Sequence, residues 1–154
     1  MTTKNETSSL LALNARSQDD MEIISALLQD SISRITNISW QKKKYRFSMF
    51  VYRFRWELLP IGKLGSISFS RVNTVLIFDG VLQVSSLGIK NALANDVLSL
   101  LRMDLKSYKD FDEIKLTFSG NIFIKLRVEF LDIRLKDLQS LNNSAVSNIP
   151  KHEN

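Results

Sequence analysis

The spacing of apolar residues changes once along the chain, from the period of an α-helix to the period of a β-strand. Met21, Ile24 and Leu28 recur at positions i, i+3 and i+7, which predicts an amphipathic helix over residues 17–30. Ser17 is a suitable N-cap, because an acidic residue follows it three positions later. Beyond this segment the apolar positions approach a period of two, so we predict no second strong helix.

Two turn motifs lie between apolar runs and predict β-hairpins. Asp79-Gly80 separates two short apolar segments, the usual signature of a type I′ turn between paired strands. Ser119-Gly120-Asn121 separates two segments in which apolar and polar residues alternate strictly. At each of the two turns, the segment before the turn is therefore expected to pair with the segment after it.

Residues 45–57 form a long aromatic-rich segment whose phase slips. The apolar residues up to Val51 share one parity, whereas those from Phe50 to Trp56 share the other. We therefore predict either a bulge near residues 49–51 or a central strand buried on both faces. In this interpretation the aromatic side chains face the core.

Together these patterns predict an α+β fold, an antiparallel β meander of about seven strands packed by one N-terminal amphipathic helix. The sheet is expected to be open or a partly rolled barrel. At 154 residues the chain fits one domain, which we place at residues 9–138. The polar segments 1–8 and 139–154 are predicted to be disordered tails.

Composition narrows the possible chemistry. The chain has no cysteine, which excludes disulfides, thiolate metal ligands and cysteine nucleophiles. The start of the chain lacks the apolar segment of a secretory signal, and no apolar run approaches the ~18 residues of a membrane helix. We therefore expect a cytoplasmic protein with no membrane contact.

No arrangement of residues predicts an active site. The one histidine, His152, lies two residues from the end and has no neighbours to orient it as a base. Asp110, Asp112 and Glu113 lack the spacing of a calcium loop and are interpreted as a solvated turn. Five scattered glycines fit no phosphate-binding loop. We assign no catalytic residue, no metal site and no cofactor.

Positive charge is the one feature that points to a partner. Residues 41–71 hold eight basic residues against one acid, Glu57, although the whole chain carries only +5. Lysines and arginines interleaved with aromatic residues are typical of surfaces that bind phosphate backbones and stack bases. The candidate binding residues are Lys42, Lys43, Lys44, Arg46, Arg53 and Arg55. A turn whose lysines prevent unwanted strand pairing is the alternative interpretation.

Several segments, in this order and spacing, resemble a family known as domain of unknown function 2948, found mainly in alphaproteobacteria. The matching segments are Leu10–Leu13, Asp20–Asp30, Arg53–Glu57, Phe78–Val81, Ser86–Ile89, Val97–Leu101 and Leu135–Leu138. They span nearly the whole chain. The resemblance implies a bacterial cytoplasmic protein with a single domain, and it implies no activity.

The sequence leaves the function open. Our leading hypothesis is a non-enzymatic binding or interaction module that uses residues 42–55. An RNA- or ribosome-associated basic protein is the first alternative, and a small enzyme limited to carboxylate, lysine or tyrosine chemistry is the second. An exposed apolar sheet face would instead indicate a homodimer or another protein partner.

Overall fold

In a computed structural model of the chain, residues 10–61, 70–89 and 96–139 are described. The predicted tails therefore lie outside the described residues except for Gln139, and so does His152. The elements, in chain order, are β1 (Ala12–Ala15), α2 (Gln18–Leu27), β2 (Ser31–Arg34), η1 (Ile35–Asn37), β3 (Ile38–Gln41), η2 (Lys42–Lys44), β4 (Arg46–Phe54), η3 (Trp56–Ile61), β5 (Arg71–Asp79), β6 (Val81–Leu87), β7 (Val97–Ser107), β8 (Asp112–Phe118), β9 (Ile122–Val128) and β10 (Ile133–Asp137). The segments labelled η are short 3₁₀ helices.

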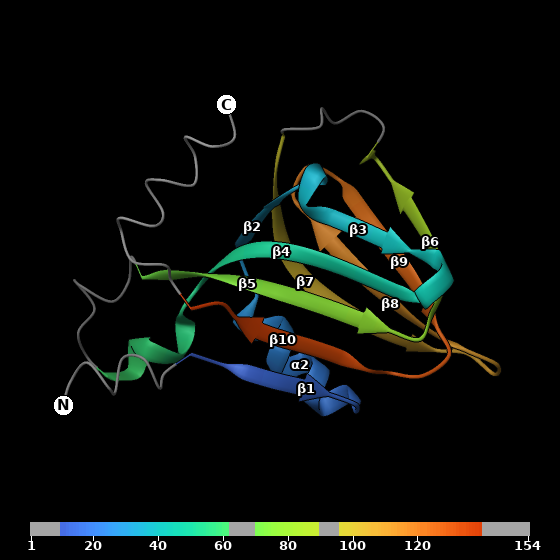
Figure 1. Cartoon of the computed structure of the whole chain (residues 1–154), viewed down its shortest axis with the longest axis horizontal. Coiled ribbons are helices and arrows are strands. Elements are labelled where there is room, and N and C mark those ends of the chain that lie inside the picture. Colours follow the sequence, from blue (N-terminus) through green and yellow to red (C-terminus); the bar gives the residue numbers. More distant parts are fainter. Residues whose placement is uncertain (1–9, 62–69, 90–95, 140–154) are drawn as a thin grey trace.

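The strands form one antiparallel sheet that stays open (Figure 1). Its order is β1-β10-β5-β4-β2-β7-β8-β9-β6, and β3 pairs with β4 beside this path. Among the described residues the sheet has ten strands rather than about seven, and its order is not that of a meander. One reason is the 3₁₀ turn η1, which divides the segment before β4 into two strands. Another is β10, which pairs with β5 and β1 rather than with β9.

The predicted hairpin at Ser119-Gly120-Asn121 is confirmed, because β8 and β9 pair in register on either side of it. The predicted hairpin at Asp79-Gly80 is wrong. Strand β5 pairs with β4 and β10, whereas β6 pairs with β9. In the strand order, β6 lies six places away from β5. The dipeptide does turn the chain through a left-handed glycine, as its composition suggests. It does so at a corner where the chain leaves one set of strands for another.

This corner curls the sheet. Gly80 alone joins β5 to β6, and consecutive Cα atoms are only about 3.8 Å apart, so two distant places in the strand order must lie close in space. The Val81 amide donates to the Tyr45 carbonyl at 3.0 Å, and the Glu129 amide donates to the Gly80 carbonyl at 2.9 Å. The sheet is therefore folded over itself, with β4, β5 and β10 in front of β7, β8 and β9 (Figure 1).

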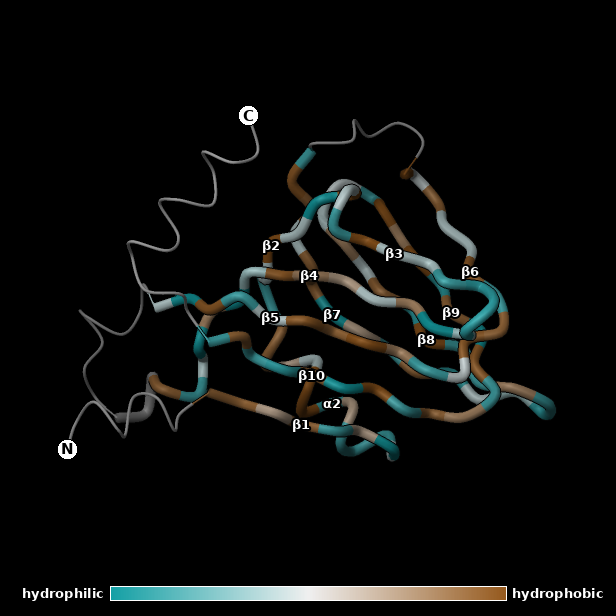
Figure 2. The backbone as a smooth tube through the Cα atoms, viewed as in Figure 1, coloured by the Kyte–Doolittle hydropathy of each residue, from teal (hydrophilic) through white to brown (hydrophobic). Residues whose placement is uncertain are grey.

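The core lies inside this fold. Buried and more exposed residues alternate along β4, β5, β9 and β10, and the inward residues form one buried cluster. Figure 2 shows long hydrophobic stretches on β4 and β5. Strands β4, β5, β7, β8, β9 and β10 all contribute to it, and many of its side chains are fully buried. Because one cluster includes residues from both halves of the strand order, the sheet buries its inner face against itself.

The helix α2 begins where the sequence predicts. The Ser17 hydroxyl accepts a hydrogen bond from the Asp20 amide at 3.2 Å. Met21 and Ile24 join the core cluster, and α2 contacts both β1 and β7. It ends at Leu27, three residues before the predicted end, because the Asp30 backbone turns left-handed and its amide donates to the Leu100 carbonyl of β7. Among the described residues, no helix has the length and apolar character needed to cross a membrane.

The corner at Gly80 should be intolerant of a side chain. Gly80 has φ +73°, and a Cβ atom there would lie 2.7 Å from the Phe130 ring. Gly120 has a similar φ of +79° but open space around it. Gly120→Ala should cost about 1–2 kcal/mol from backbone strain alone, and Gly80→Ala should cost more because the ring must also move. Urea unfolding of both variants measures this difference, and equal losses would contradict the steric role of Phe130.

Candidate functional site

Strand β4 runs through the centre of the predicted contact region, and it has no bulge. It pairs with β5 in one register over all of its nine residues. The bulge predicted near residues 49–51 is therefore wrong. The alternative of a strand buried on both faces is also wrong, because buried residues alternate strictly with more exposed ones along β4. Its inward residues are Phe47, Met49, Val51 and Arg53, all buried. The apolar period breaks because an arginine, not an apolar residue, takes the last inward position.

Arg53 is fully buried and makes two paired sets of hydrogen bonds. Its Nε and Nη2 atoms donate to the Asp137 carboxylate at 2.9 and 2.7 Å. Its Nη1 and Nη2 atoms donate to the Glu57 carboxylate at 2.9 and 2.8 Å. Asp137 also accepts from the Thr74 hydroxyl at 2.8 Å and from the Leu11 amide at 2.9 Å. Every charge in this cluster therefore has a partner within hydrogen-bonding distance.

The cluster keeps its groups charged. Burial by itself lowers the pKa of Arg53, but the hydrogen bonds and charges of Glu57 and Asp137 outweigh it and raise that pKa. Burial by itself raises the pKa of Asp137, and the hydrogen bonds from Arg53, Leu11 and Thr74 hold it below its ordinary value of 3.8. Arg53 thus belongs to the core, and the prediction that it is a surface binding residue is wrong.

The opposite face of β4 exposes aromatic side chains that we expected inside. Phe50 and Tyr52 are 53% and 45% exposed, and Phe54, next in the alternation, is half-buried. We call these three residues the aromatic stripe. Alternate residues of a strand are about 6.6 Å apart, so the stripe presents rings at regular intervals along the twisted strand.

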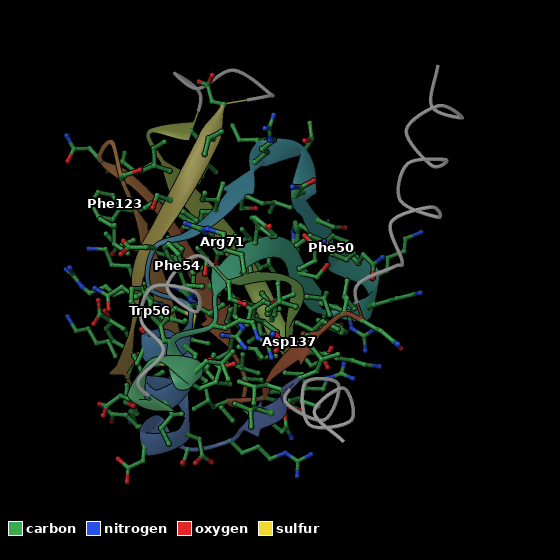
Figure 3. The ribbon with its side chains drawn as sticks, turned by 90° about the vertical axis from the view of Figure 1, so that its left-hand side faces the viewer. Phe50, Phe54, Trp56, Arg71, Phe123 and Asp137 are labelled. Atoms are coloured by element: carbon green, nitrogen blue, oxygen red, sulfur yellow. The ribbon has the colours of Figure 1, made fainter. Side chains whose placement is uncertain are left out.

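Arg71 of β5 lies against this stripe. Its guanidinium carbon is 3.7 Å from the centre of the Phe54 ring and 5.6 Å from that of Tyr52. Trp56 packs against Phe54 with ring centres 5.1 Å apart. Figure 3 shows Arg71 beside Phe54 and Trp56, while Asp137 lies among the ribbons of the interior. Such cation–π contacts hold the arginine over the rings and leave part of its charge at the surface.

A hollow of about 200 Å³ opens beside the stripe, between β2 and β4. The two strands pair only through Ile32 and Tyr52, because η1 leads β2 away and β3 takes the rest of that edge of β4. Side chains of Arg34, Asn37, Phe50 and Tyr52 help to line it. The stripe is therefore bordered by a concave surface rather than by a flat one.

The face around the stripe is cationic. The register of β2, β4, β5 and β10 puts five basic residues on the same side as the stripe, Arg34, Arg46, Arg71, Arg134 and Lys136. On these four strands, Asp79 is the one acidic residue on this side, and it pairs with Arg46 and Arg134, each at 2.8 Å. The outer side of these four strands therefore carries an excess of four positive charges.

The structure brings together part of the predicted basic surface. Lys42, Lys43 and Lys44 form η2 immediately before β4, and all three are exposed. Arg46 begins β4 on the face of the stripe, whereas Arg55 follows the end of β4 and is half-buried. The lysines and Arg46 thus lie at one end of the stripe and Arg71 at the other.

Sequence reasoning missed Phe50, Tyr52, Arg71, Arg134 and Lys136 as surface partners. The available signal was the phase slip in residues 45–57. It arises because Arg53 interrupts one apolar series, and such an interruption leaves open which face of the strand is buried. The contributions of β5 and β10 had no local signal, because their position beside β4 depends on long-range pairing. In residues 10–61, 70–89 and 96–139, no group of three or more His, Asp or Glu side chains is placed to hold a metal ion.

The fold and this surface define a small single-domain α+β protein built on one open, curled antiparallel sheet. The family model described as Protein of unknown function (DUF2948) matches residues 11–152, nearly the whole chain. The chain belongs to this family, as the resemblance in its sequence indicated. No curated protein and no solved structure matches it.

The Arg53 cluster predicts a large loss of stability on removal of its central carboxylate. Asp137→Asn leaves a buried guanidinium without half of its counter-charge, which should cost about 3 kcal/mol or more in the free energy of unfolding. Asp79→Asn is the matched control, because Asp79 pairs with two arginines whose side chains are 40% and 44% exposed. That change should cost at most about 1 kcal/mol. Chemical denaturation measures both, and similar losses would contradict the role of burial.

The same cluster predicts a dependence of stability on pH. The pKa of Asp137 is lower in the folded chain than its ordinary value of 3.8, so the unfolded chain takes up the proton first as pH falls. The stabilisation is complete above that ordinary value and is lost as pH falls through the folded pKa. Unfolding free energies measured between neutral pH and pH ~2 should fall less steeply in Asp137→Asn than in the wild type, and parallel curves would contradict this assignment.

Proposed function

We propose that this chain is a non-enzymatic binding module whose partner is single-stranded RNA, held along the aromatic stripe of β4. The observation that carries the proposal is the exposure of Phe50 and Tyr52 on a face with a large excess of positive charge. Neighbouring exposed apolar side chains that are rimmed by polar residues often mark a surface that a partner covers. Rings beside cations are the combination by which proteins hold single strands.

The two parts of the surface have separate roles in this proposal. The rings stack on bases, which requires no sequence preference because every base has a π-face. Arg71, Lys136 and the lysines of η2 contact phosphates, which supplies the salt-dependent part of the affinity. The hollow beside Tyr52 gives room for a base or a ribose that turns away from the stripe.

The absence of acidic residues from two surface hollows of the described chain supports a binding role over an enzymatic one. The hollow beside the stripe has no carboxylate in its lining, and neither does a second hollow on β6, β8 and β9. Asp137, whose pKa is lowered, is fully buried and paired. A small enzyme that relies on carboxylates would need such a group within reach of a substrate.

Removal of the exposed rings tests the proposal. Each stacked base contributes about 1–3 kcal/mol, so Phe50→Ser combined with Tyr52→Ser should weaken binding of a fluorescein-labelled oligouridine at least ~30-fold. Fluorescence anisotropy measures the affinity. Tyr108→Ser is the matched control, because Tyr108 is 42% exposed and lies in the turn between β7 and β8, away from β4.

Three outcomes would overturn the RNA assignment. The first is a wild type that does not bind oligouridine at low salt, and the second is a ring variant that binds as well as Tyr108→Ser does. The third is a wild-type dimer in sedimentation equilibrium that the ring variant converts to a monomer, since the stripe would then be an interface between two copies of the chain.

Removal of the turn lysines tests the electrostatic part. Each phosphate contact contributes about 0.7 to the slope of log K against log salt for a single strand. Changing Lys42, Lys43 and Lys44 to Gln should therefore lower this slope by about 2. Changing Lys106, Lys109 and Arg127 to Gln removes the same charge from β7, from the turn after it and from β9, and should leave the slope nearly unchanged. Equal effects of the two triple variants would show that net charge, not the surface near β4, determines binding.

A further inference from the structure

A second surface lies on the other side of the molecule, on the outer face of β6, β8 and β9. Figure 3 shows Phe123 of β9 on the side opposite to Phe50. A hollow of about 330 Å³ opens there, lined by Ser85, Ser86, Leu87, Lys115, Phe123 and Lys125. This volume is within the range of sites that hold small molecules.

The strand register places two like charges side by side in this hollow. Lys115 of β8 lies directly opposite Lys125 of β9, and Lys125 lies opposite Ser85 of β6. Side chains at such positions have Cβ atoms about 4.5–5.5 Å apart, and like charges there are unfavourable. The repulsion between Lys115 and Lys125 therefore lowers the stability of the folded chain.

By strand register, two acidic residues neighbour the pair: Asp104 lies opposite Lys115, and Glu113 lies two positions before Lys115 on the same side of β8. Neither lysine makes an ion pair with any residue of the described chain. The Asp104 carboxylate pairs with Arg102 at 3.0 Å and is 54% exposed. The Lys115 ammonium lies 4.3 Å from the centre of the Phe123 ring, which holds it at the surface of the hollow.

We propose that this hollow binds a small organic phosphate monoester. The phosphate would lie between Lys115 and Lys125, where it accepts hydrogen bonds from both ammonium groups and from the Ser85 hydroxyl. A phosphate monoester carries nearly two negative charges at neutral pH and has three strong acceptor oxygens, so it matches two cations and a hydroxyl. Leu87, which is 67% exposed, and the edge of Phe123 form the apolar wall for the rest of the ligand.

This site does not depend on the proposed RNA surface, because it shares none of its residues with the aromatic stripe. Its lysines are on strands β8 and β9, whereas the stripe is on β4. A variant can therefore remove one site and leave the other intact.

Titration calorimetry with phenyl phosphate and inorganic phosphate tests the proposal on the full chain. Phenyl phosphate should bind the wild type about tenfold more tightly than inorganic phosphate, because its ring covers Leu87 and Phe123. Lys115→Gln combined with Lys125→Gln should weaken phenyl phosphate binding at least about tenfold. Lys106→Gln, on the same outer face beside Tyr108, should bind as the wild type does.

Thermal unfolding gives a second readout that does not require tight binding. Phenyl phosphate should raise the Tm of the wild type more than sodium chloride of equal ionic strength does. It should have no such effect on the double lysine variant, whose own Tm should not fall, because the repulsion between the lysines is gone.

The proposal is overturned if the wild type does not bind phenyl phosphate at millimolar concentration, or if the double lysine variant binds it equally well. Equal affinity for phenyl phosphate and inorganic phosphate would also overturn it, because the apolar wall would then have no role. The variant with Phe50→Ser and Tyr52→Ser should retain the site, so the failure of either proposal can be told from the failure of the other.

Discussion

The buried contact between Arg53 and Asp137 links parts of the chain that are far apart in sequence and not adjacent in the sheet. Strand β5 lies between β4 and β10, and its Thr74 hydroxyl bonds to the same carboxylate. The Leu11 amide and Glu57 extend the cluster towards β1 and η3. A buried arginine tolerates few geometries, because each unpaired donor costs desolvation energy. The cluster therefore specifies how four strands and one turn come together, whatever its net contribution to stability.

That specification has a consequence for the surface. Once Arg53 faces inward, the alternation of β4 requires Phe50, Tyr52 and Phe54 to face outward, since neighbouring side chains of a strand point to opposite sides. The aromatic stripe therefore lies on the face of β4 opposite to the face that carries Arg53. The same argument explains the cations around it, because the register of β5 and β10 against β4 turns Arg71, Arg134 and Lys136 to that face.

The corner at Gly80 gives the molecule its two separate outer faces. Because one residue connects β5 to β6, the sheet must fold over and bury its inner side against itself. The outer side of β4 and β5 then carries rings and a large excess of positive charge. The outer side of β8 and β9 carries the facing lysines Lys115 and Lys125 beside a hollow. Both surfaces favour anions, but they differ in shape, one an extended row of rings and the other a small concave site.

The sequence by itself determined the features that depend on neighbours along the chain. The helix with its Ser17 cap, the hairpin between β8 and β9, the turn lysines and the family all follow from local spacing and composition. The tertiary structure alone decided the partners of β5 and β6 and the burial of Arg53. A period of two says which residues share a face of a strand, but not which strand lies beside it or which face is inside. The inward direction of Arg53 depends on its contact with Asp137. Asp137 lies 84 residues away in the sequence and reaches Arg53 only in the folded sheet.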